Sequence, residues 1–341
     1  KFGKNFFFSD EIKFSIFPQP KVTLKNLMLR DNSNLYQINI KKVLLHSNWK
    51  LIFKKEFKIK NIELIRPDIG IDLTRKKNFL KHNINYNQSN FLEDLNIKLK
   101  RYFTYFDSLK LSDGKINLFL NNSSEKFNFN MKVLNKKETK IFGNIKINKF
   151  NSDILYDIET TDFLNSNINL EYLFKDEISL KQKILISGIF SVQKKSLLFK
   201  GNLNSEYIDL NKLLPLDLFS LDKNNGFFLV TNDLSPDTQF LINIDGEVGK
   251  IKFLDHITEQ CKFNININEN KLIIRDFQSS YLNSNLNLNS QYSFKSKVLD
   301  NFLNLENLKL PKIENNSKYS LEGGIFDASA SFKISLRKNN K

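Results

Sequence analysis

The sequence predicts a mostly β protein in which one long sheet has an apolar face and a polar face. The clearest evidence is the segment Ser279 to Phe294, in which apolar residues occupy even positions with Asn or Gln between them. A period of two is the mark of a strand whose two faces differ. The same alternation recurs around Phe127, Ile168 and Phe263. Such a sheet must bury its apolar face against another layer, close on itself, or present it to an apolar ligand.

The N-terminal segment is predicted to be extended up to two prolines and then to continue as a strand. Residues Glu11 to Pro20 include Pro18 and Pro20, which lack an amide donor and favour extended conformations in the residues before them. The apolar residues between Val22 and Leu29 then predict a second strand.

The next two segments have mixed patterns. Between Val43 and Phe53, an apolar run with the only tryptophan, Trp49, is compatible with a short helix or with a pleated edge strand. From Ile59 to Leu73 the pattern predicts two strands interrupted at Pro67, because proline cannot donate to a central ladder.

One or two short helices are predicted. In Asn90 to Phe106, apolar residues recur at spacings of three and four behind Asn90, a residue type that caps helices. This helix is expected to act as a structural brace. The segment Asp209 to Ser220 is either a two-turn helix or a loop, because Pro215 would lie in its interior.

The remaining elements are predicted to form a β meander. The dipeptides Asp113-Gly114 and Asp245-Gly246 are predicted to be its turns, since Asp-Gly is a frequent hairpin connection. The segment Tyr319 to Leu336 is predicted to add closing strands.

We therefore predict three parts in the chain of 341 residues. Residues 1–110 are an N-terminal β module with the bracing helix near residues 90–106. Residues 111–294 are a continuous antiparallel β-groove. Residues 295–341 are closing strands and a disordered tail.

The net charge of +15 would suit a nucleic acid or an anionic membrane surface, but the lysines are scattered along the chain. The aromatic residues alternate with Asn and Ser more often than with Lys or Arg, and no RNP-type motif is present. We therefore expect no nucleic-acid partner. A nucleic-acid binder remains the third interpretation, and affinity that falls steeply with salt would support it.

Residues for catalysis are scarce. The three histidines, His46, His82 and His256, are far apart in sequence and form no metal-binding pair. Cys261 opens an apolar strand and is interpreted as a buried filler. The sequence has no nucleophile elbow and no glycine-rich phosphate loop. We expect no enzymatic activity, catalytic residue, metal or cofactor.

The cysteine count and the hydropathy limit the possible cellular locations of the protein without selecting one. A lone cysteine excludes an intramolecular disulfide and permits a periplasmic location without proving one. No run of about 18 apolar residues, which a membrane-spanning helix requires, occurs in this sequence. Because the first residue is Lys1, we expect that an N-terminal anchor or signal precedes this sequence.

Several segments together resemble the AsmA-like proteins of Gram-negative envelopes, whose relatives include TamB and bridge-like lipid-transfer proteins. The resemblance rests on the order and spacing of strand pairs interrupted by proline or followed by Asp-Gly, and it covers about Phe14 to Phe294. The sequence departs from the family at Arg75 to Leu80, where the family often has a glycine and an Asn-Trp pair. The segments are FSIFPQPKVTLKNLMLRD (Phe14–Asp31), IELIRPDIGIDL (Ile62–Leu73), LKLSDGKINL (Leu109–Leu118), FKGNLNSEYIDLNKLLP (Phe199–Pro215), INIDGEVGKIKF (Ile242–Phe253) and KLIIRDFQSSYLNSNLNLNSQYSF (Lys271–Phe294).

The resemblance implies a long, curled antiparallel sheet with an apolar concave face and a wet convex face. It further implies a periplasmic protein, anchored to the inner membrane, that binds or conducts phospholipid or another acyl lipid between the inner and outer membranes. The alternative is a scaffold that assists outer-membrane protein assembly, with outer-membrane assembly proteins as partners and no lipid carriage.

The candidate groove residues are the apolar members of the alternating segments. Ordinary β-core packing is the equal alternative for each of them. They are Phe127, Phe129, Met131, Ile168, Leu170, Tyr172, Phe263, Ile265, Ile267, Leu282, Leu286, Leu288, Tyr292 and Phe294.

Overall fold

The structure is a computed structural model, and it confirms the predicted fold class. Of the described residues, 87% are in strands and 2% in helix, and seventeen of the strands that these residues form belong to one mainly antiparallel sheet. The residues that it describes are 6–30, 36–49, 59–72, 97, 101, 105–120, 123–135, 137–147, 152–162, 164–174, 182–193, 196–210, 239–253, 255–268, 270–282, 284–296, 298–309, 313–314, 320–321 and 325–335.

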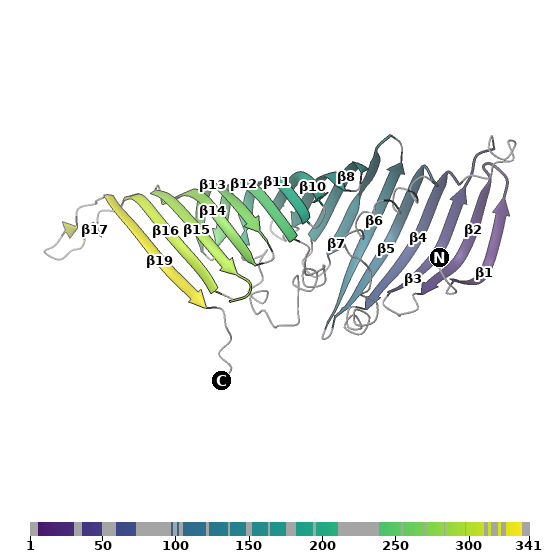
Figure 1. Cartoon of the computed structure of the whole chain (residues 1–341), viewed down its shortest axis with the longest axis horizontal. Helices are drawn as coiled ribbons and strands as arrows, with labels where there is room; N and C mark the ends of the chain where they lie inside the picture. The colour runs from purple at the N-terminus through teal and green to yellow at the C-terminus, as the bar shows by residue number, and fades with distance from the viewer. Residues whose placement is uncertain are drawn as a thin grey trace. The chain divides into compact units, whose positions relative to one another are not determined.

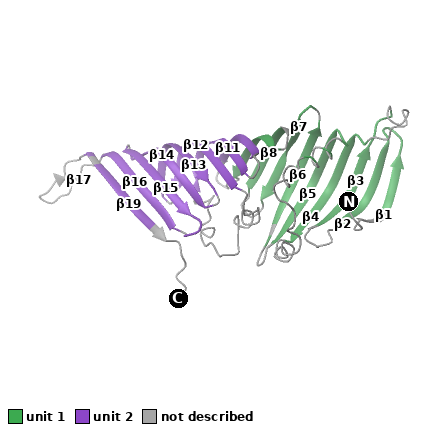
Figure 2. Cartoon of the chain, in the orientation of Figure 1, with its two compact units in different colours: residues 1–181 green, residues 182–341 purple. Residues whose placement is uncertain are grey.

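The chain divides into two compact units, residues 1–181 and residues 182–341 (Figure 2). This division differs from the expected boundaries after residues 110 and 294. Each unit has its own set of hydrogen-bonded strands, and we describe the two units separately.

In unit 1, nine strands follow one another in chain order, each paired with the next (Figure 1). All of these pairs are antiparallel except β4–β5, which is parallel. The strands are β1 (Phe6–Ser15), β2 (Lys21–Arg30), β3 (Tyr36–His46), β4 (Asn61–Asp72), β5 (Ser108–Leu120), β6 (Ser123–Asn135), β7 (Thr139–Ile147), β8 (Ser152–Asp162) and β9 (Asn165–Phe174).

Unit 2 repeats this arrangement with eight strands, and its parallel pair is β11–β12. Two short strands, β17 (Ile313–Glu314) and β18 (Ser320–Leu321), pair only with each other among the described residues. The eight strands are β10 (Gln182–Gln193), β11 (Ser196–Asp209), β12 (Gln239–Phe253), β13 (His256–Ile267), β14 (Lys271–Tyr281), β15 (Ser284–Ser293), β16 (Val298–Lys309) and β19 (Ile325–Ser335).

Both predicted helices fall in the connections between parallel strands, which must be long because the chain has to return to the start of the next strand. Within Asn90 to Phe106, the described residues Ile97 and Arg101 are helical. Asp209 is the last residue of β11 and Leu210 is helical. The rest of both predicted helices lies outside the described residues, apart from Tyr105 and Phe106, which are not helical.

The segment Val43 to Phe53, left open between helix and strand, begins as strand. Residues Val43 to His46 end β3, and Trp49 is helical. The Trp49 indole Nε1 donates to the Pro18 carbonyl at 3.1 Å, which ties the end of β3 to the β1–β2 connection. Residues 50–53 lie outside the described part.

Three strands of unit 1 are irregular near their middle. Asn26 in β2, Arg66 in β4 and Asp113 in β5 have left-handed backbones, with φ of 51°, 54° and 55°. At Asn26 and Arg66 one residue is skipped on each of the two paired strands and the register is unchanged, whereas at Asp113 the register shifts, which marks a β-bulge in β5. A bulge inserts one unpaired residue, bends the strand and moves the following side chains to the opposite parity.

Unit 2 has the same device at Gln260, Asp276 and Asn307, with φ of 53°, 51° and 61°. Two of these bulges are held by a side chain of the next strand. The Asp276 amide donates to Asn289 Oδ1 at 3.0 Å, and the Asn307 amide donates to Asp327 Oδ1 at 2.7 Å. The amide that leaves the ladder at a bulge therefore still has an acceptor.

Three predictions about strand ends are wrong. Asp113-Gly114 and Asp245-Gly246 are not turns, because both dipeptides lie inside strands, β5 and β12. Glycine is needed there because a phenylalanine ring of the next strand occupies the space of its missing Cβ. Pro67 does not end a strand either: it is buried within β4, directly after Arg66, whose backbone is left-handed.

The fully buried core is small. In unit 1 it centres on Leu27, Ile40 and Val43, which are 9%, 4% and 4% exposed. Most of the described apolar side chains are only partly covered.

Candidate apolar binding face

The register places apolar residues opposite one another across all nine strands of unit 1. Residues directly opposite on neighbouring strands share a face of the sheet, so each row of partners crosses the unit on one side. The first row runs Ile12, Leu24, Val43, Leu64, Leu111, Met131, Gly143, Tyr156, Leu170, and the second runs Phe14, Val22, Leu45, Ile62, Leu109, Val133, Ile141, Ile158, Ile168.

Unit 2 has equivalent rows, which cross its strands from β10 to β16. The first of them is entirely apolar, and the second is apolar apart from one Ser-Asn pair and two glycines. The first runs Phe190, Phe199, Ile242, Ile267, Leu272, Tyr292, Leu299, and the second runs Gly188, Gly201, Ile244, Ile265, Ile274, Ser290, Asn301. We call these surfaces the apolar faces of unit 1 and unit 2.

All six candidate residues of unit 1 lie on its apolar face. Met131, Leu170 and Ile168 belong to the two rows. The others face further apolar partners: Phe127 is opposite Ile147, Phe129 is opposite Ile145, and Tyr172 is opposite Ile154.

Six of the eight candidates in unit 2 lie on its apolar face. Phe263 stacks on Phe277, with ring centroids 6.1 Å apart. A further candidate, Phe294, lies just beyond β15, where its ring meets that of Tyr292 edge-on at 5.6 Å. The six are Phe263, Ile265, Ile267, Leu286, Leu288 and Tyr292.

The prediction that Leu282 continues the alternation is wrong. Leu282 lies in the connection between β14 and β15, has a φ of 49°, and is 65% exposed. Its even number matches that of Leu286, but the chain reverses direction between them.

Sequence reasoning missed about half of the apolar faces, including Val133, the most buried large side chain of unit 1, and Phe277. The bulges explain part of this. In β14, Leu272 and Ile274 are on the face at even positions, and after the bulge Phe277 is on it at an odd position. A search that allowed one change of parity per strand would have found these residues.

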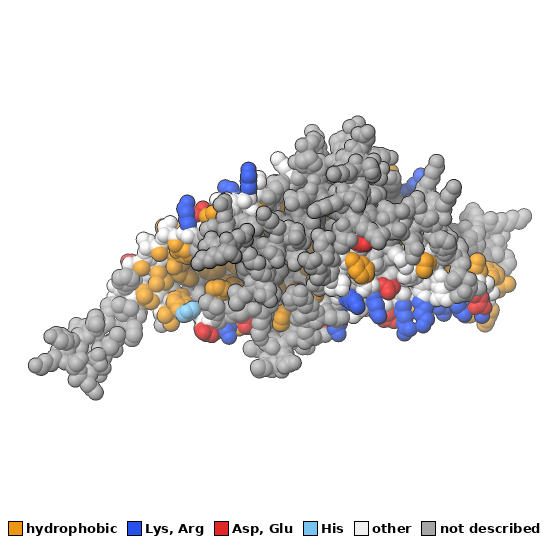
Figure 3. Space-filling model, turned by 90° about the horizontal axis from the view of Figure 1, so that it is seen from below, with side chains coloured by type: hydrophobic (Ala, Val, Ile, Leu, Met, Phe, Trp, Pro, Cys, Tyr) orange, Lys and Arg blue, Asp and Glu red, His pale blue; other side chains and the backbone are white. Residues whose placement is uncertain are grey.

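Most residues of the apolar faces are half-buried rather than buried. Phe129 and Val133 are 7% and 1% exposed, but at β1 Ile12 and Phe14 are 66% and 59% exposed. Figure 3 shows hydrophobic side chains gathered over β15, β16 and β19 of unit 2. These faces therefore retain apolar surface that a ligand can cover.

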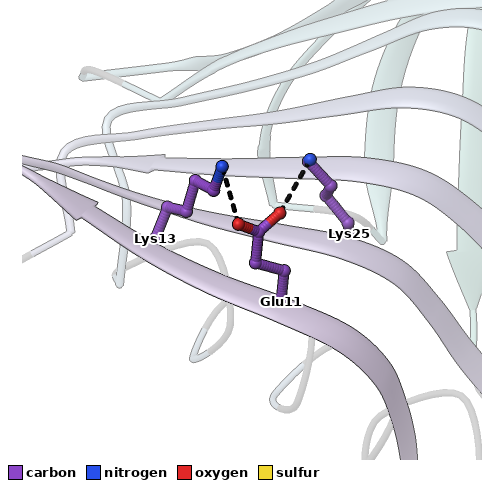
Figure 4. Close-up of polar contacts among 3 residues, drawn as sticks. All are labelled: Glu11, Lys13 and Lys25. Atoms are coloured by element: carbon purple, nitrogen blue, oxygen red, sulfur yellow. Dashed lines mark hydrogen bonds and ion pairs between the residues drawn. The ribbon is translucent and has the colours of Figure 1, made fainter.

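The opposite face of each unit is mainly polar, although a few apolar side chains such as Leu155 in unit 1 and Ile189 and Phe302 in unit 2 are exposed on it. Several of its charges are paired. In unit 1, Glu11 Oε1 and Oε2 accept from Lys13 and Lys25 at 2.6 and 2.8 Å (Figure 4), and Lys140 pairs with Glu159. Each exposed pair stabilises the fold little. The Glu11–Lys25 and Lys140–Glu159 partners are opposite in register, so these two pairs favour one register over its neighbours.

Unit 2 repeats this pattern on its polar face. Lys262 is 3.2 Å from Glu247, Lys250 is 2.7 Å from Glu259, and in each case the two residues are direct register partners. An Asn ladder accompanies them: Asn264 Nδ2 donates to Asn243 Oδ1 at 2.7 Å. The charged and amide groups thus stay on the side opposite the apolar rows.

The pKa values of three side chains on the apolar faces are raised by their low-polarity surroundings. Burial raises the pKa of the Tyr156 hydroxyl in unit 1. In unit 2, burial raises the pKa of the Tyr292 hydroxyl and of the Cys261 thiol. Each shift has the direction expected when a charged form loses water.

A shallow depression of about 460 Å³ lies on the polar side of unit 2. Most of its lining residues, among them Arg275, Asp300, Phe302 and Lys333, alternate with the residues of the apolar rows. The lining also includes Ile274, Ser290 and Asn301, which the register places in the second row of the apolar face. The Lys333–Asp300 ion pair, at 3.4 Å, lies in it.

Among the described residues no three His, Cys, Asp or Glu side chains come together as a metal site would require. In the same residues no helix has the length and hydrophobicity needed to cross a bilayer.

Comparison of the chain with protein-family models gave no match, and comparison with curated proteins gave none.

Proposed function

We propose that this protein binds acyl lipids, phospholipids in particular, on its apolar faces and conducts them without a chemical step. The observation that supports this is the set of mainly apolar rows, which cross β1 to β9 in unit 1 and β10 to β16 in unit 2. An ordinary core would bury such rows under a second layer, whereas most of these side chains are half-buried.

The energetics favour an acyl ligand. Each methylene moved from water onto an apolar surface gains about 0.8 kcal/mol, so a lipid tail leaves a bilayer only for an equally apolar surface. With strands about 4.8 Å apart, the nine strands of unit 1 extend over roughly 38 Å. An acyl chain spans half of the roughly 30 Å hydrocarbon core, so the face exceeds one chain in length.

We extend the proposal to the setting implied by the sequence resemblance. The protein would be an AsmA-like envelope protein, anchored to the inner membrane by a segment outside this sequence and exposed to the periplasm. Lipid headgroups would stay in water while the tails lie on the apolar face. Direction would come from a partner or from mass action.

The second candidate is a scaffold for outer-membrane protein assembly that carries no lipid. The observation that favours it is the exposure of Ile12 and Phe14 on the first strand of unit 1, which could receive another β chain.

The deciding experiment is native mass spectrometry with lipid extraction on the chain purified from a Gram-negative host. We expect stoichiometric phospholipid in the wild type. Leu286→Asp should abolish it, because a carboxylate on the apolar face would have to be desolvated under the tail.

Asn287→Asp is the matched control, since it places the same charge one residue away on the polar face. It should retain the lipid. A folded Leu286→Asp variant that binds as much phospholipid as the wild type would contradict the proposal. A well-folded wild type that takes up no phospholipid would favour the scaffold.

A further inference from the structure

One hydrogen-bonded polar pair interrupts the apolar face of unit 2. Ser290 in β15 and Asn301 in β16 are register partners in the second row, and Ser290 Oγ donates to Asn301 Oδ1 at 2.8 Å. The two residues are only 8% and 9% exposed. Along β16 their neighbours on the same face are Leu299 and Leu303.

The amide nitrogen of this pair has an unused donor. Asn301 Nδ2 is buried and has no hydrogen-bond partner among the described residues. A buried donor without an acceptor destabilises the folded state, because it has given up its bonds to water. A leucine at this position would continue the row without that cost, so the retained amide points to an acceptor that a ligand supplies.

The surroundings of Asn301 favour a neutral acceptor. The cations Arg275 and Lys333 line the same depression as Asn301 but are in the alternate register positions, and Lys333 is paired with Asp300 at 3.4 Å. The described neighbours of Asn301 on its own face, Ile274, Leu299 and Leu303, carry no charge that would balance a phosphate. A carbonyl oxygen needs only one donor and sits within an otherwise apolar molecule.

We propose that Asn301 donates a hydrogen bond to the ester carbonyl of an acyl lipid lying on the apolar face of unit 2. This inference rests on the proposed function and deepens it, since it places the junction between acyl chain and glycerol at one residue. The Ser290 hydroxyl donates to Asn301 Oδ1, so Asn301 Nδ2 is the group that donates to the ligand.

The test compares two phosphatidylcholines that have the same headgroup and chain length, one with ester-linked and one with ether-linked chains. Their competition for the full chain is measured by native mass spectrometry. The ether lipid lacks the carbonyl, so the wild type should prefer the ester lipid by about fivefold, the value of one ordinary hydrogen bond.

Asn301→Leu should bind both lipids equally, and Asn287→Leu, on the polar face of the neighbouring strand, should keep the preference. Equal binding of the two lipids by the wild type would overturn the inference and leave lipid binding intact. Binding of neither lipid would overturn both. The wild-type comparison decides the question even if Asn301→Leu fails to fold.

Discussion

The ring of Phe129 in β6 lies directly over Gly114 in β5, its register partner. A Cβ atom at position 114 would be 2.5 Å from two carbons of that ring. Phe263 covers Gly246 in the same way in unit 2. In both units an aromatic side chain therefore fills the gap that a strand glycine leaves on the apolar face.

We expect Gly114→Ala to destabilise unit 1 by about 1–3 kcal/mol, because the ring has to leave its position. Gly70→Ala in the neighbouring strand is the control, since its Cβ would be 3.6 Å from the Phe119 ring, an ordinary contact. Urea unfolding measures both variants. Equal stability of the two would contradict the role assigned to the ring.

Two substitutions at the Asp113 bulge should change the stability of the fold in different ways, because one removes a hydrogen bond and the other relieves backbone strain. The Asp113 amide donates to Asn130 Oδ1 at 2.9 Å, so Asn130→Ala should cost about 0.5–1.5 kcal/mol. Asp113→Gly should be neutral or stabilising, because glycine adopts a φ of 55° without strain. Thermal unfolding measures both variants. Marked destabilisation by Asp113→Gly would contradict the idea that the backbone of Asp113 is strained.

Cys261 should be nearly inert towards alkylation in the folded protein. It is 1% exposed, and burial raises the pKa of its thiol, so little reactive thiolate is present near neutral pH. Iodoacetamide labelling followed by mass spectrometry should be slow without denaturant and fast with it. In Leu282→Cys, the exposed cysteine should react quickly while Cys261 stays protected. Rapid native labelling of Cys261 would show that this part of the face opens.

The Glu11 cluster predicts a dependence of stability on pH. The hydrogen bonds from Lys13 and then Lys25 hold the pKa of the Glu11 carboxyl below its ordinary value of 4.5. Because the folded pKa is the lower one, the stabilisation is present above the unfolded pKa and disappears as pH falls through the folded pKa.

Glu11→Gln should therefore be less stable than the wild type at neutral pH, and the difference between the two proteins should be smaller at about pH 3. Urea midpoints at the two pH values measure the effect, which should also shrink in high salt. An unchanged difference between the two proteins at both pH values would show that the carboxylate charge is not involved.

Much of the apolar face could be predicted from local sequence. Phe263, Ile265 and Ile267 alternate with polar residues, and a period of two needs no knowledge of neighbouring strands. Leu282 shows where this reasoning fails. Its parity is right, but the chain turns there, and only the pairing of Tyr281 with Ser284 reveals the reversal.

The bulges and the parallel pairs were out of reach for a different reason. The bulge at Asp276 is defined only relative to the partner strand, where two residues of β14, Arg275 and Asp276, lie opposite one residue of β15, Asn289. Likewise, β4 and β5 form a parallel pair between segments that are far apart in the sequence. The alternation of apolar residues in each strand is equally compatible with parallel and with antiparallel pairing.

The sequence by itself determined that the chain is β-rich and that its strands have an apolar and a polar side, because alternation is a local property of the backbone. The tertiary structure decided which strands are neighbours, where the bulges shift the pattern, and that Ser290 faces Asn301 on the apolar side. These features depend on hydrogen bonds between separate strands, and those bonds select one register among several that the alternation permits.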